Sequence, residues 1–294
     1  MSRPVVTGTW YAGLAFLIWG LFPLYWIRLG GVPPAQLVAH RIVWCAAAAW
    51  LWVLLRGEGS FLRGVTPRLL GLLAIGGVLI ALNWTLYVVA VTTGHVVDTS
   101  LAYFITPLVN ILLAVFALGE KLNGAQRVAV LLAASGVIWL GWQFGAPPWM
   151  ALTLAATFAL YGLVHKLAPL PAVQGLAIES SVLLLPAIGY LLWCQWRGTG
   201  VFLHGTWRQD LLIVLGGPVT ALPLALFAAG AQRVPMTLLG VLQYISPTVA
   251  LVIGVALQGE PFGPERVVGF ALIWIALVVF TLDGWNGYRR SRAR

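Results

Sequence analysis

Residues 104–120 read FITPLVNILLAVFALGE, and residues 244–260 read YISPTVALVIGVALQGE. Both stretches have a proline near the start, a long apolar run and a closing Gly-Glu, at a constant offset of 140 positions. GGVLIAL at 76–82 meets GGPVTAL at 216–222 at the same offset. The chain therefore contains one pattern twice, which we place at residues 1–145 and 146–294. At slightly smaller offsets the match continues through Trp10 and Trp149, Leu21 and Leu160, Gln36 and Gln174, and Ala39 and Ala177.

The composition indicates a chain that folds in a lipid bilayer. Of its 294 residues, 61% are hydrophobic and only 9% are charged, whereas soluble proteins have about 25% charged residues. The mean hydropathy is +0.94. The apolar residues form continuous blocks of about 20 residues, the length of a spanning helix, and do not alternate as in a barrel strand. We expect ten helices, at about 8–27, 36–55, 69–91, 99–118, 126–144, 148–165, 174–194, 210–231, 237–257 and 265–282.

Five helices per copy have a consequence for topology. Because five is odd, the second copy must enter the membrane from the opposite side to the first. The expected fold is an all-α membrane protein with ten transmembrane helices as two inverted five-helix repeats. Inverted repeats recur in secondary transporters, where a site near the midplane opens alternately to each side. A duplicated scaffold that transports nothing is the alternative.

The basic residues predict the orientation, because loops rich in Lys and Arg stay in the cytoplasm. With the N-terminus inside, four basic residues face out, Arg28, Arg197, Arg208 and Arg266, and twelve face in. The pI near 10.2 then needs no nucleic-acid partner, and the tail YRRSRAR anchors the topology beside anionic lipid. We expect a multi-pass protein of the inner (plasma) membrane with both termini cytoplasmic. The inward set is Arg3, Arg56, Arg63, Arg68, Lys121, Arg127, Lys166, Arg233, Arg289, Arg290, Arg292 and Arg294.

Four segments carry a resemblance to a known family: NWTLYVVAV at 83–91, SLAYFITPLVNILLAVFALGEKL at 100–122, FALYGLVHK at 158–166 and LGVLQYISPT at 239–248. They resemble the RarD branch of the EamA-type drug/metabolite transporters, and the resemblance covers about residues 8–283. It implies a ten-helix, inverted-repeat permease of the bacterial inner membrane that exports small organic molecules. It also implies a historical label of chloramphenicol sensitivity or resistance. Its substrate is expected to be a small amphipathic metabolite or drug.

Ionisable side chains inside a membrane are costly and mark functional sites. Arg41 and Glu179 each lie about five residues into a helix, roughly 8 Å from its end at 1.5 Å per residue, at matching positions of the two copies. Inversion places Arg41 toward the outside and Glu179 toward the inside, on the order of 14 Å apart in depth in a 30 Å core. We therefore expect no direct salt bridge between them. Asp98 is the expected partner of Arg41, and Lys166 or His165 that of Glu179.

Each of the two charges has a functional and a structural interpretation. Low dielectric favours the neutral form of a carboxyl group, so Glu179 is a candidate for proton coupling; the alternative is a permanently paired structural carboxylate. Arg41, with His40 beside it, can bind a carboxylate or phosphate through its planar fork of donors. Arg41 can equally extend to the outer interface as a snorkelling side chain.

Polar stripes on three expected helices are candidates for lining a substrate cavity. Asn83 and Tyr87 share one helix face, as do Ser100, Tyr103 and Asn110, and Gln243 with Tyr244 lies on the matching helix of the second copy. Asn and Gln also join neighbouring spanning helices by hydrogen bonds, and Tyr and Trp gather at membrane interfaces. The substrate-cavity hypothesis comprises Asn83, Tyr87, Tyr103, Asn110, Gln243 and Arg41.

Other recurring residues suggest structural roles. Pro107 and Pro247 occupy equivalent helix positions, where proline removes a hydrogen bond and bends the axis; these kinks either gate opposite faces or are static. Glu120 and Glu260 are expected to be interfacial caps or loop partners. The two cysteines, Cys45 and Cys194, are expected to be small core residues.

The sequence contains no motif of an enzyme. HExxH, GxSxG and Walker motifs are all absent from it, as is a cluster of acidic metal ligands. We therefore expect no catalytic residues, no metal and no cofactor. An uncoupled facilitator, a channel, an uptake carrier and a membrane sensor remain as alternatives to an exporter, and no feature of the sequence fixes the oligomeric state.

Overall fold

The structure is a computed structural model that describes residues 3–29, 31–92, 96–142, 149–258 and 263–292. Over these ranges it contains helices and turns and no strand, so the expected all-α class is confirmed. The α-helices are α1 (Arg3–Trp26), α2 (Pro34–Leu55), α3 (Pro67–Thr92), α4 (Val96–Phe116), α5 (Gly124–Trp142), α6 (Trp149–Leu167), α7 (Ala172–Trp196), α8 (Trp207–Ala231), α9 (Met236–Leu242), α10 (Ile245–Gln258) and α11 (Pro264–Arg292), with 3-10 turns η1 (Ile27–Leu29) and η2 (Glu58–Gly64).

Proline and glycine set several helix ends. Pro34 and Pro67 are the first residues of α2 and α3, where the missing N–H of proline is no loss. Gly57 and Gly198 follow α2 and α7 with φ of 65° and 69°, a left-handed conformation in which glycine stops a helix. The two stops follow Arg56 and Arg197, the C-cap residues of the second helix of each half.

One expected helix is divided. The block predicted at 237–257 is α9 followed by α10, with a break at Gln243 and Tyr244. Pro247 explains the break, because its ring clashes with the carbonyl four residues earlier, that of Gln243, and it has no N–H to donate. The Gln243 carbonyl accepts from the Ser246 N–H instead, at 3.2 Å. Pro107, its equivalent, lies inside an unbroken α4, so a kink there stays a prediction.

Eight helical stretches of the described chain are long and apolar enough to cross a membrane, and α9 with the first part of α10 forms one of them. The chain is therefore a multi-pass membrane protein. Two further apolar stretches, Ala102–Phe116 in α4 and Val267–Asp283 in α11, are shorter over the residues whose side chains the structure describes. The count of ten crossings thus stays a prediction.

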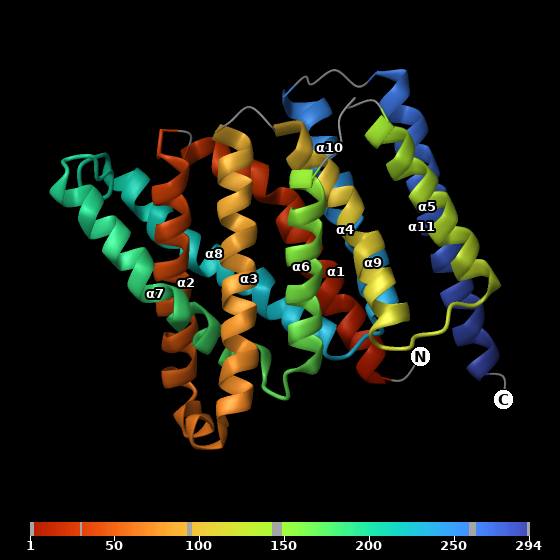
Figure 1. Cartoon of the computed structure of the whole chain (residues 1–294), viewed down its shortest axis with the longest axis horizontal. Helices are drawn as coiled ribbons and strands as arrows, with labels where there is room; N and C mark the ends of the chain where they lie inside the picture. Colours follow the sequence, from red (N-terminus) through yellow and green to blue (C-terminus); the bar gives the residue numbers. More distant parts are fainter. Residues whose placement is uncertain (1–2, 30, 93–95, 143–148, 259–262, 293–294) are drawn as a thin grey trace.

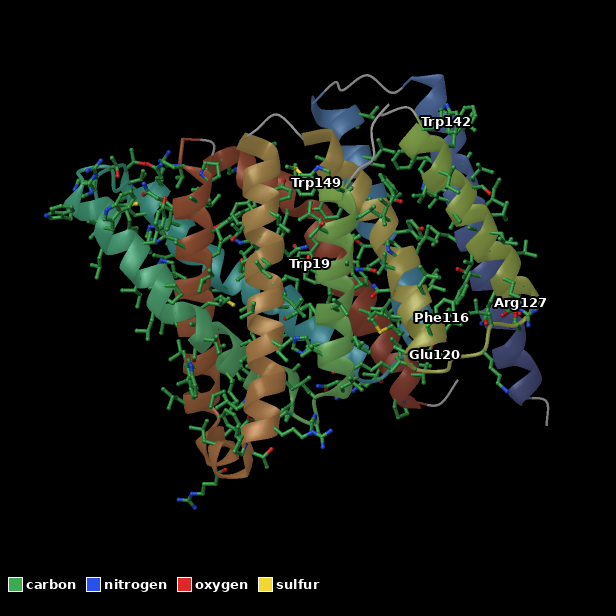
Figure 2. All side chains as sticks on the ribbon, in the orientation of Figure 1. Trp19, Phe116, Glu120, Arg127, Trp142 and Trp149 are labelled. Carbon is green, nitrogen blue, oxygen red and sulfur yellow. The ribbon has the colours of Figure 1, made fainter. Side chains whose placement is uncertain are left out.

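The two ends of the bundle differ in their residues. Figure 1 shows the N- and C-termini at one end, together with η2 and the turn between α4 and α5. Figure 2 places Glu120 and Arg127 toward this end, and Trp142 and Trp149 toward the other. This arrangement agrees with the grouping of loops used to predict the orientation; which end is cytoplasmic stays a prediction.

Helices from the two halves of the chain pack against each other. α3 packs on α6 and α7, while α8 packs on α1 and α2; α2 also contacts α7, and α5 contacts α11 along its length, at the edge of the bundle in Figure 1. A methyl group on Gly136 of α5 would lie 2.7 Å from the Gly269 carbonyl oxygen, so glycine permits this close approach. Cys45 and Cys194 are free and buried, as predicted.

Candidate functional site

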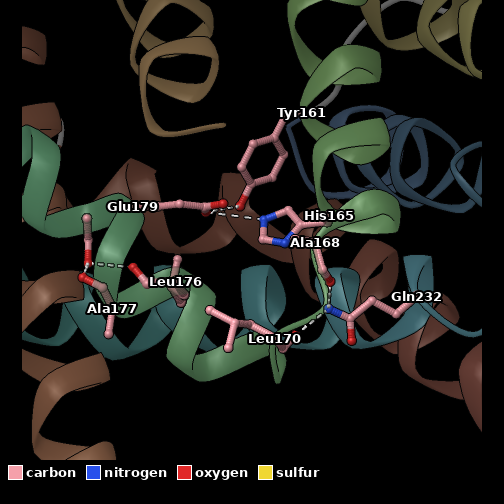
Figure 3. A network of polar contacts seen from close by, with 9 residues as sticks. Tyr161, His165, Ala168, Leu170, Leu176, Ala177, Glu179 and Gln232 are labelled. Atoms are coloured by element: carbon pink, nitrogen blue, oxygen red, sulfur yellow. Dashed lines mark hydrogen bonds and ion pairs between the residues drawn. The ribbon is translucent and has the colours of Figure 1, made fainter. Parts of the chain in front are cut away.

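Glu179 on α7 lies in the core, beside two side chains of α6. It is 1% exposed, and its Oε2 lies 3.2 Å from His165 Nε2. The Tyr161 hydroxyl donates to the same oxygen at 3.3 Å. Figure 3 shows these three side chains converging. His165 is thus confirmed as the partner of Glu179, whereas Lys166, the other candidate, donates to the Val234 carbonyl at 2.6 Å.

This cluster leaves polar atoms unsatisfied. Glu179 Oε1 is buried with no hydrogen-bond partner, and His165 Nε2 is close to the carboxyl group but not aligned for a hydrogen bond. Buried polar atoms in folded proteins are hydrogen-bonded in the great majority of cases. An unpaired carboxylate oxygen in the core marks Glu179 as a candidate functional residue.

The same carboxyl group lines a small cavity of about 20 Å³ between α2, α3 and α7. Cys45, Ile80 and Trp84 are among its other lining residues. A volume of this size is that of a single water site. It is too small for an organic substrate, so in this conformation the Glu179 cluster is closed to anything larger than water.

Two glycines of α3 allow that helix to lie against Glu179. A methyl group on Gly76 would come within 2.8 Å of Glu179 Oε1, and one on Gly77 within 2.9 Å of the Glu179 backbone oxygen. Real Cβ contacts essentially never reach such distances. The glycine pair seen in the sequence repeat is therefore the surface on which Glu179 rests.

Arg41 on α2 has a different environment. Its guanidinium carbon lies 4.4 Å from the ring centroid of Trp84 and 4.8 Å from that of Trp26. Its Nε donates to Thr220 Oγ1 at 3.1 Å. Tyr87 and Tyr103 are among its electrostatic neighbours.

The expected pairing of Arg41 with Asp98 stays a prediction. The side chain of Asp98 lies outside the described residues, and no acidic side chain within the described part of the chain forms an ion pair with Arg41. His40 directs its ring toward Phe202, at a centroid distance of 5.1 Å. Arg41 is therefore a cation among aromatic rings, partly exposed.

The structure separates the remaining cavity candidates. Asn110 donates its side-chain N–H to Gln243 Oε1, and both side chains are buried, at 0% and 6% exposure. Asn83 donates to the Leu154 carbonyl at 2.8 Å and to Thr157 Oγ1 at 3.0 Å, joining α3 to α6. The six candidates therefore lie in separate groups: Arg41 with Tyr87 and Tyr103 near it, the pair of Asn110 and Gln243, and Asn83 between α3 and α6. A cavity role for all six stays a prediction. Ser100 lies outside the side chains that the structure describes.

Glu120 caps a helix of the other copy. Its carboxylate accepts from the Met236 N–H at 2.7 Å and from the N–H and hydroxyl of Thr237 at 3.1 Å and 2.7 Å. The expected capping role is confirmed for Glu120, and Glu260 lies outside the described residues. The carboxylate ties the end of the first copy to the start of α9.

Several contributors to these clusters were not predicted from the sequence. Tyr161 precedes His165 by four residues on α6, a spacing that places both on one helix face and was available as a signal. Trp26 and Thr220 carried no such signal, because their contact with Arg41 depends on how α1 and α8 pack on α2. Within the described residues no group of three or more His, Cys, Asp or Glu side chains could hold a metal ion.

Known proteins share the sequence pattern of this chain. The model of the EamA-like transporter family matches the chain twice, at residues 6–142 and 147–282. The chain belongs to the EamA-like transporter family. This EamA chain is 43% identical to "Protein RarD" of Streptomyces exfoliatus over 98% of its own length and 92% of that protein. It is 40% identical to "Uncharacterized transporter YojE" of Bacillus subtilis, over 97% of each.

A solved crystal structure shows the same fold. It superposes on the EamA chain with a TM-score of 0.74 at 24% sequence identity, covering 96% of this chain and 98% of that one. Because curated relatives named RarD match nearly the whole chain, the resemblance to the RarD branch is confirmed. The chain is a membrane transporter with a small-molecule substrate, as its family and two relatives named as uncharacterized transporters support.

Proposed function

We propose that the chain is a secondary-active permease of the inner (plasma) membrane that exports small amphipathic metabolites or drugs by alternating access. Residues 1–145 and 146–294 form its two inverted five-helix repeats, with both termini in the cytoplasm. Proton entry drives the export.

The observation that carries this proposal is the exchange of packing partners between the halves. α3 lies on α6 and α7, and α8 lies on α1 and α2, so each third helix packs on the first and second helices of the other half. The double match of the family model supports the duplication. Equivalent contacts in two inverted halves provide two packings of similar energy, which alternating access requires.

Proton coupling is assigned to Glu179 together with its neighbours. His165 and Tyr161 face the carboxyl group from α6, and the Cys45 thiol faces the same cavity from α2. An imidazolium with a carboxylate, or an imidazole with a carboxylic acid, gives the same net charge of zero. The pair therefore favours holding one exchangeable proton inside the membrane, where an isolated charge is costly.

Substrate contact is assigned to the side chains proposed from the sequence. Arg41, Tyr87 and Tyr103 form the polar part of the proposed pathway, and Tyr87 and Tyr103 are 42% and 50% exposed. Asn110, Gln243 and Asn83 lie in contacts between helices, where a change of packing would release their hydrogen bonds. Pro247, at the break between α9 and α10, and Pro107 are the proposed sites of bending.

The experiment that tests the function is flux into proteoliposomes that contain the purified protein. Amino acids, small aromatic metabolites and chloramphenicol are screened with and without an imposed proton gradient. Accumulation that depends on the gradient is the expected result. Flux that ignores the gradient would instead identify a facilitator, flux with the opposite proton dependence an uptake carrier, and binding without flux a sensor or scaffold.

A further inference from the structure

The fold builds the same kind of position twice. Arg41 and Glu179 are 138 residues apart, the offset that also relates Gln36 to Gln174. Each lies on the second helix of its half and faces a glycine on the third helix of the other half. A methyl group on Gly76 would come within 2.8 Å of Glu179 Oε1, and one on Gly216 within 3.9 Å of Arg41 Cγ. The two charges are therefore structural equivalents with opposite signs.

The equivalent positions differ in how closed they are. Glu179 is 1% exposed and is covered by Tyr161 and His165 (Figure 3). Arg41 is partly exposed, and the neighbouring Tyr87 and Tyr103 retain exposed fractions of 42% and 50%. Arg41 and its two neighbouring tyrosines are therefore accessible from outside the helix bundle, whereas Glu179 is not.

The guanidinium of Arg41 uses one of its donors within the protein, and the positions of its other donors limit which ligands it can bind. Its Nε is hydrogen-bonded to Thr220, and two indoles, Trp26 and Trp84, flank it. In the described part of the chain, Nε is the only atom of the guanidinium with a hydrogen-bond acceptor. The outer edge, with the N–H groups of both Nη atoms, presents the parallel donors that match a carboxylate.

We propose that Arg41 binds the carboxylate of an aromatic organic monoanion, which is the substrate of the transporter proposed above. The carboxylate pairs with the Nη edge of Arg41, and the aromatic ring of the substrate packs on the rings of Trp84, Tyr87 and Tyr103, which supply stacking area at low entropy cost. A ligand with a single negative charge neutralises the single positive charge of Arg41. A phosphate dianion would leave an unpaired charge within the membrane.

Binding to the purified protein in nanodiscs tests this assignment independently of transport. The probes are phenylacetate, its neutral isostere phenylacetamide, and cyclohexylacetate, which keeps the charge and lacks the aromatic ring. Isothermal titration calorimetry is expected to rank phenylacetate first. The variant Arg41→Gln is expected to lower the affinity for phenylacetate roughly tenfold to a hundredfold, the range for the loss of a hydrogen bond to a charged group. The affinity for phenylacetamide is expected to stay the same.

Two further variants complete the design. Arg41→Lys keeps the positive charge but lacks the two parallel N–H donors of the guanidinium. Its affinity for phenylacetate is expected to lie between those of the unchanged protein and Arg41→Gln. Arg197→Gln removes a guanidinium that also stacks on an indole, that of Trp193 at 5.7 Å, but on the exposed surface; it is expected to bind all three probes as the unchanged protein does. Size-exclusion profiles and thermal midpoints verify that each variant is folded.

The outcomes separate this inference from the proposed function. Equal affinity for phenylacetate and phenylacetamide, an unchanged affinity in folded Arg41→Gln, or no binding of either anion at millimolar concentration overturns the assignment of Arg41. If proteoliposomes then still show gradient-dependent flux of neutral or cationic molecules, the transporter function stands without it. If phenylacetate binds through Arg41 but no molecule of the panel is transported, the site stands and the function fails.

Discussion

Gly76 of α3 lies directly against the carboxyl group of Glu179 on α7. A methyl group on Gly76 would come within 2.8 Å of Glu179 Oε1 and within 3.1 Å of Val164 Cγ1. The carboxyl group therefore forms part of the surface on which α3 packs. Any change in its charge or hydration acts on the contact between helices from the two halves of the chain.

The variant Gly76→Ala is expected to destabilise the protein and to slow transport. The added methyl group forces α3 away from Glu179, and overpacking of this kind costs about 1–3 kcal/mol. Gly71→Ala is the matched control on the same helix, because a methyl group there meets no atom within 4 Å and alanine is the better helix former. Thermal midpoints in detergent and initial flux rates measure both. Equal effects of the two substitutions would contradict the proposed contact.

The variant Glu179→Gln is expected to abolish the dependence of export on a proton gradient. The unchanged protein should export faster when the outside is more acidic than the cytoplasmic side, because protons then enter through the pair of Glu179 and His165. The glutamine amide keeps the shape of the side chain but cannot exchange the proton. Flux in proteoliposomes at several imposed pH differences measures the effect.

Controls for this prediction come from the same pair and from an acidic residue elsewhere. His165→Gln is expected to reduce the gradient dependence as well, because the remaining carboxyl group loses the partner that balances its charge. Glu58→Gln changes a carboxylate near the start of α7, where Gln174 donates to it at 3.2 Å, and should leave the gradient dependence intact. A Glu179→Gln protein whose export still follows the gradient would exclude Glu179 as the coupling group.

The sequence predicted the features that depend on residues close together in the chain. Continuous apolar blocks predicted the helices, the positions of Arg41 and Glu179 followed from the repeat, and the choice of His165 as one of two partners followed from helix ends. The sequence did not predict which side chains of other helices reach Arg41, because the contacts of Trp26 and Thr220 depend on tertiary packing.

Two further differences have identifiable causes. The break between α9 and α10 was missed because proline within a spanning helix can leave the helix continuous, as Pro107 does in α4, or divide it, as happens before Pro247. For Asn83 the sequence left two roles open, lining a cavity and joining helices; its carboxamide joins α3 to α6, and the cavity role stays a prediction. Spacing along a helix indicates which residues share a face and not which neighbour that face meets.

The buried pair of Asn110 and Gln243 is expected to show strong energetic coupling. Asn110 donates to Gln243 Oε1, so Asn110→Ala leaves that oxygen without its donor at a cost of about 1–3 kcal/mol. Gln243→Ala should cost a similar amount, and the double variant clearly less than the sum. A double-mutant cycle on unfolding free energies measures the coupling. Additive effects would show that the two side chains act independently.

The orientation of the chain is expected to place the end with both termini in the cytoplasm. The turn η2, which contains Ser60, lies at that end, and the segment between α7 and α8, which contains His204, lies at the opposite one (Figure 1). In whole cells a membrane-impermeant maleimide should label His204→Cys directly, and Ser60→Cys only after permeabilisation. The natural cysteines are both buried, so background labelling should be low. The reverse pattern would invert the proposed topology.

The variant Glu120→Gln is expected to loosen the start of α9. The carboxylate of Glu120 accepts from the backbone N–H groups of Met236 and Thr237, two donors that have no partner within the helix. Loss of a capping acceptor costs about 0.5–2 kcal/mol, and the loss of negative charge at a helix N-terminus adds to it. Asp283→Asn is the control, because that carboxylate accepts from Asn123 at 2.7 Å in an exposed position, where such contacts contribute little.

Hydrogen exchange of the α9 amides should therefore accelerate in Glu120→Gln and not in Asp283→Asn. Unchanged exchange in Glu120→Gln would mean that α9 is held by its packing alone, and that the two halves of the chain are not joined through this carboxylate.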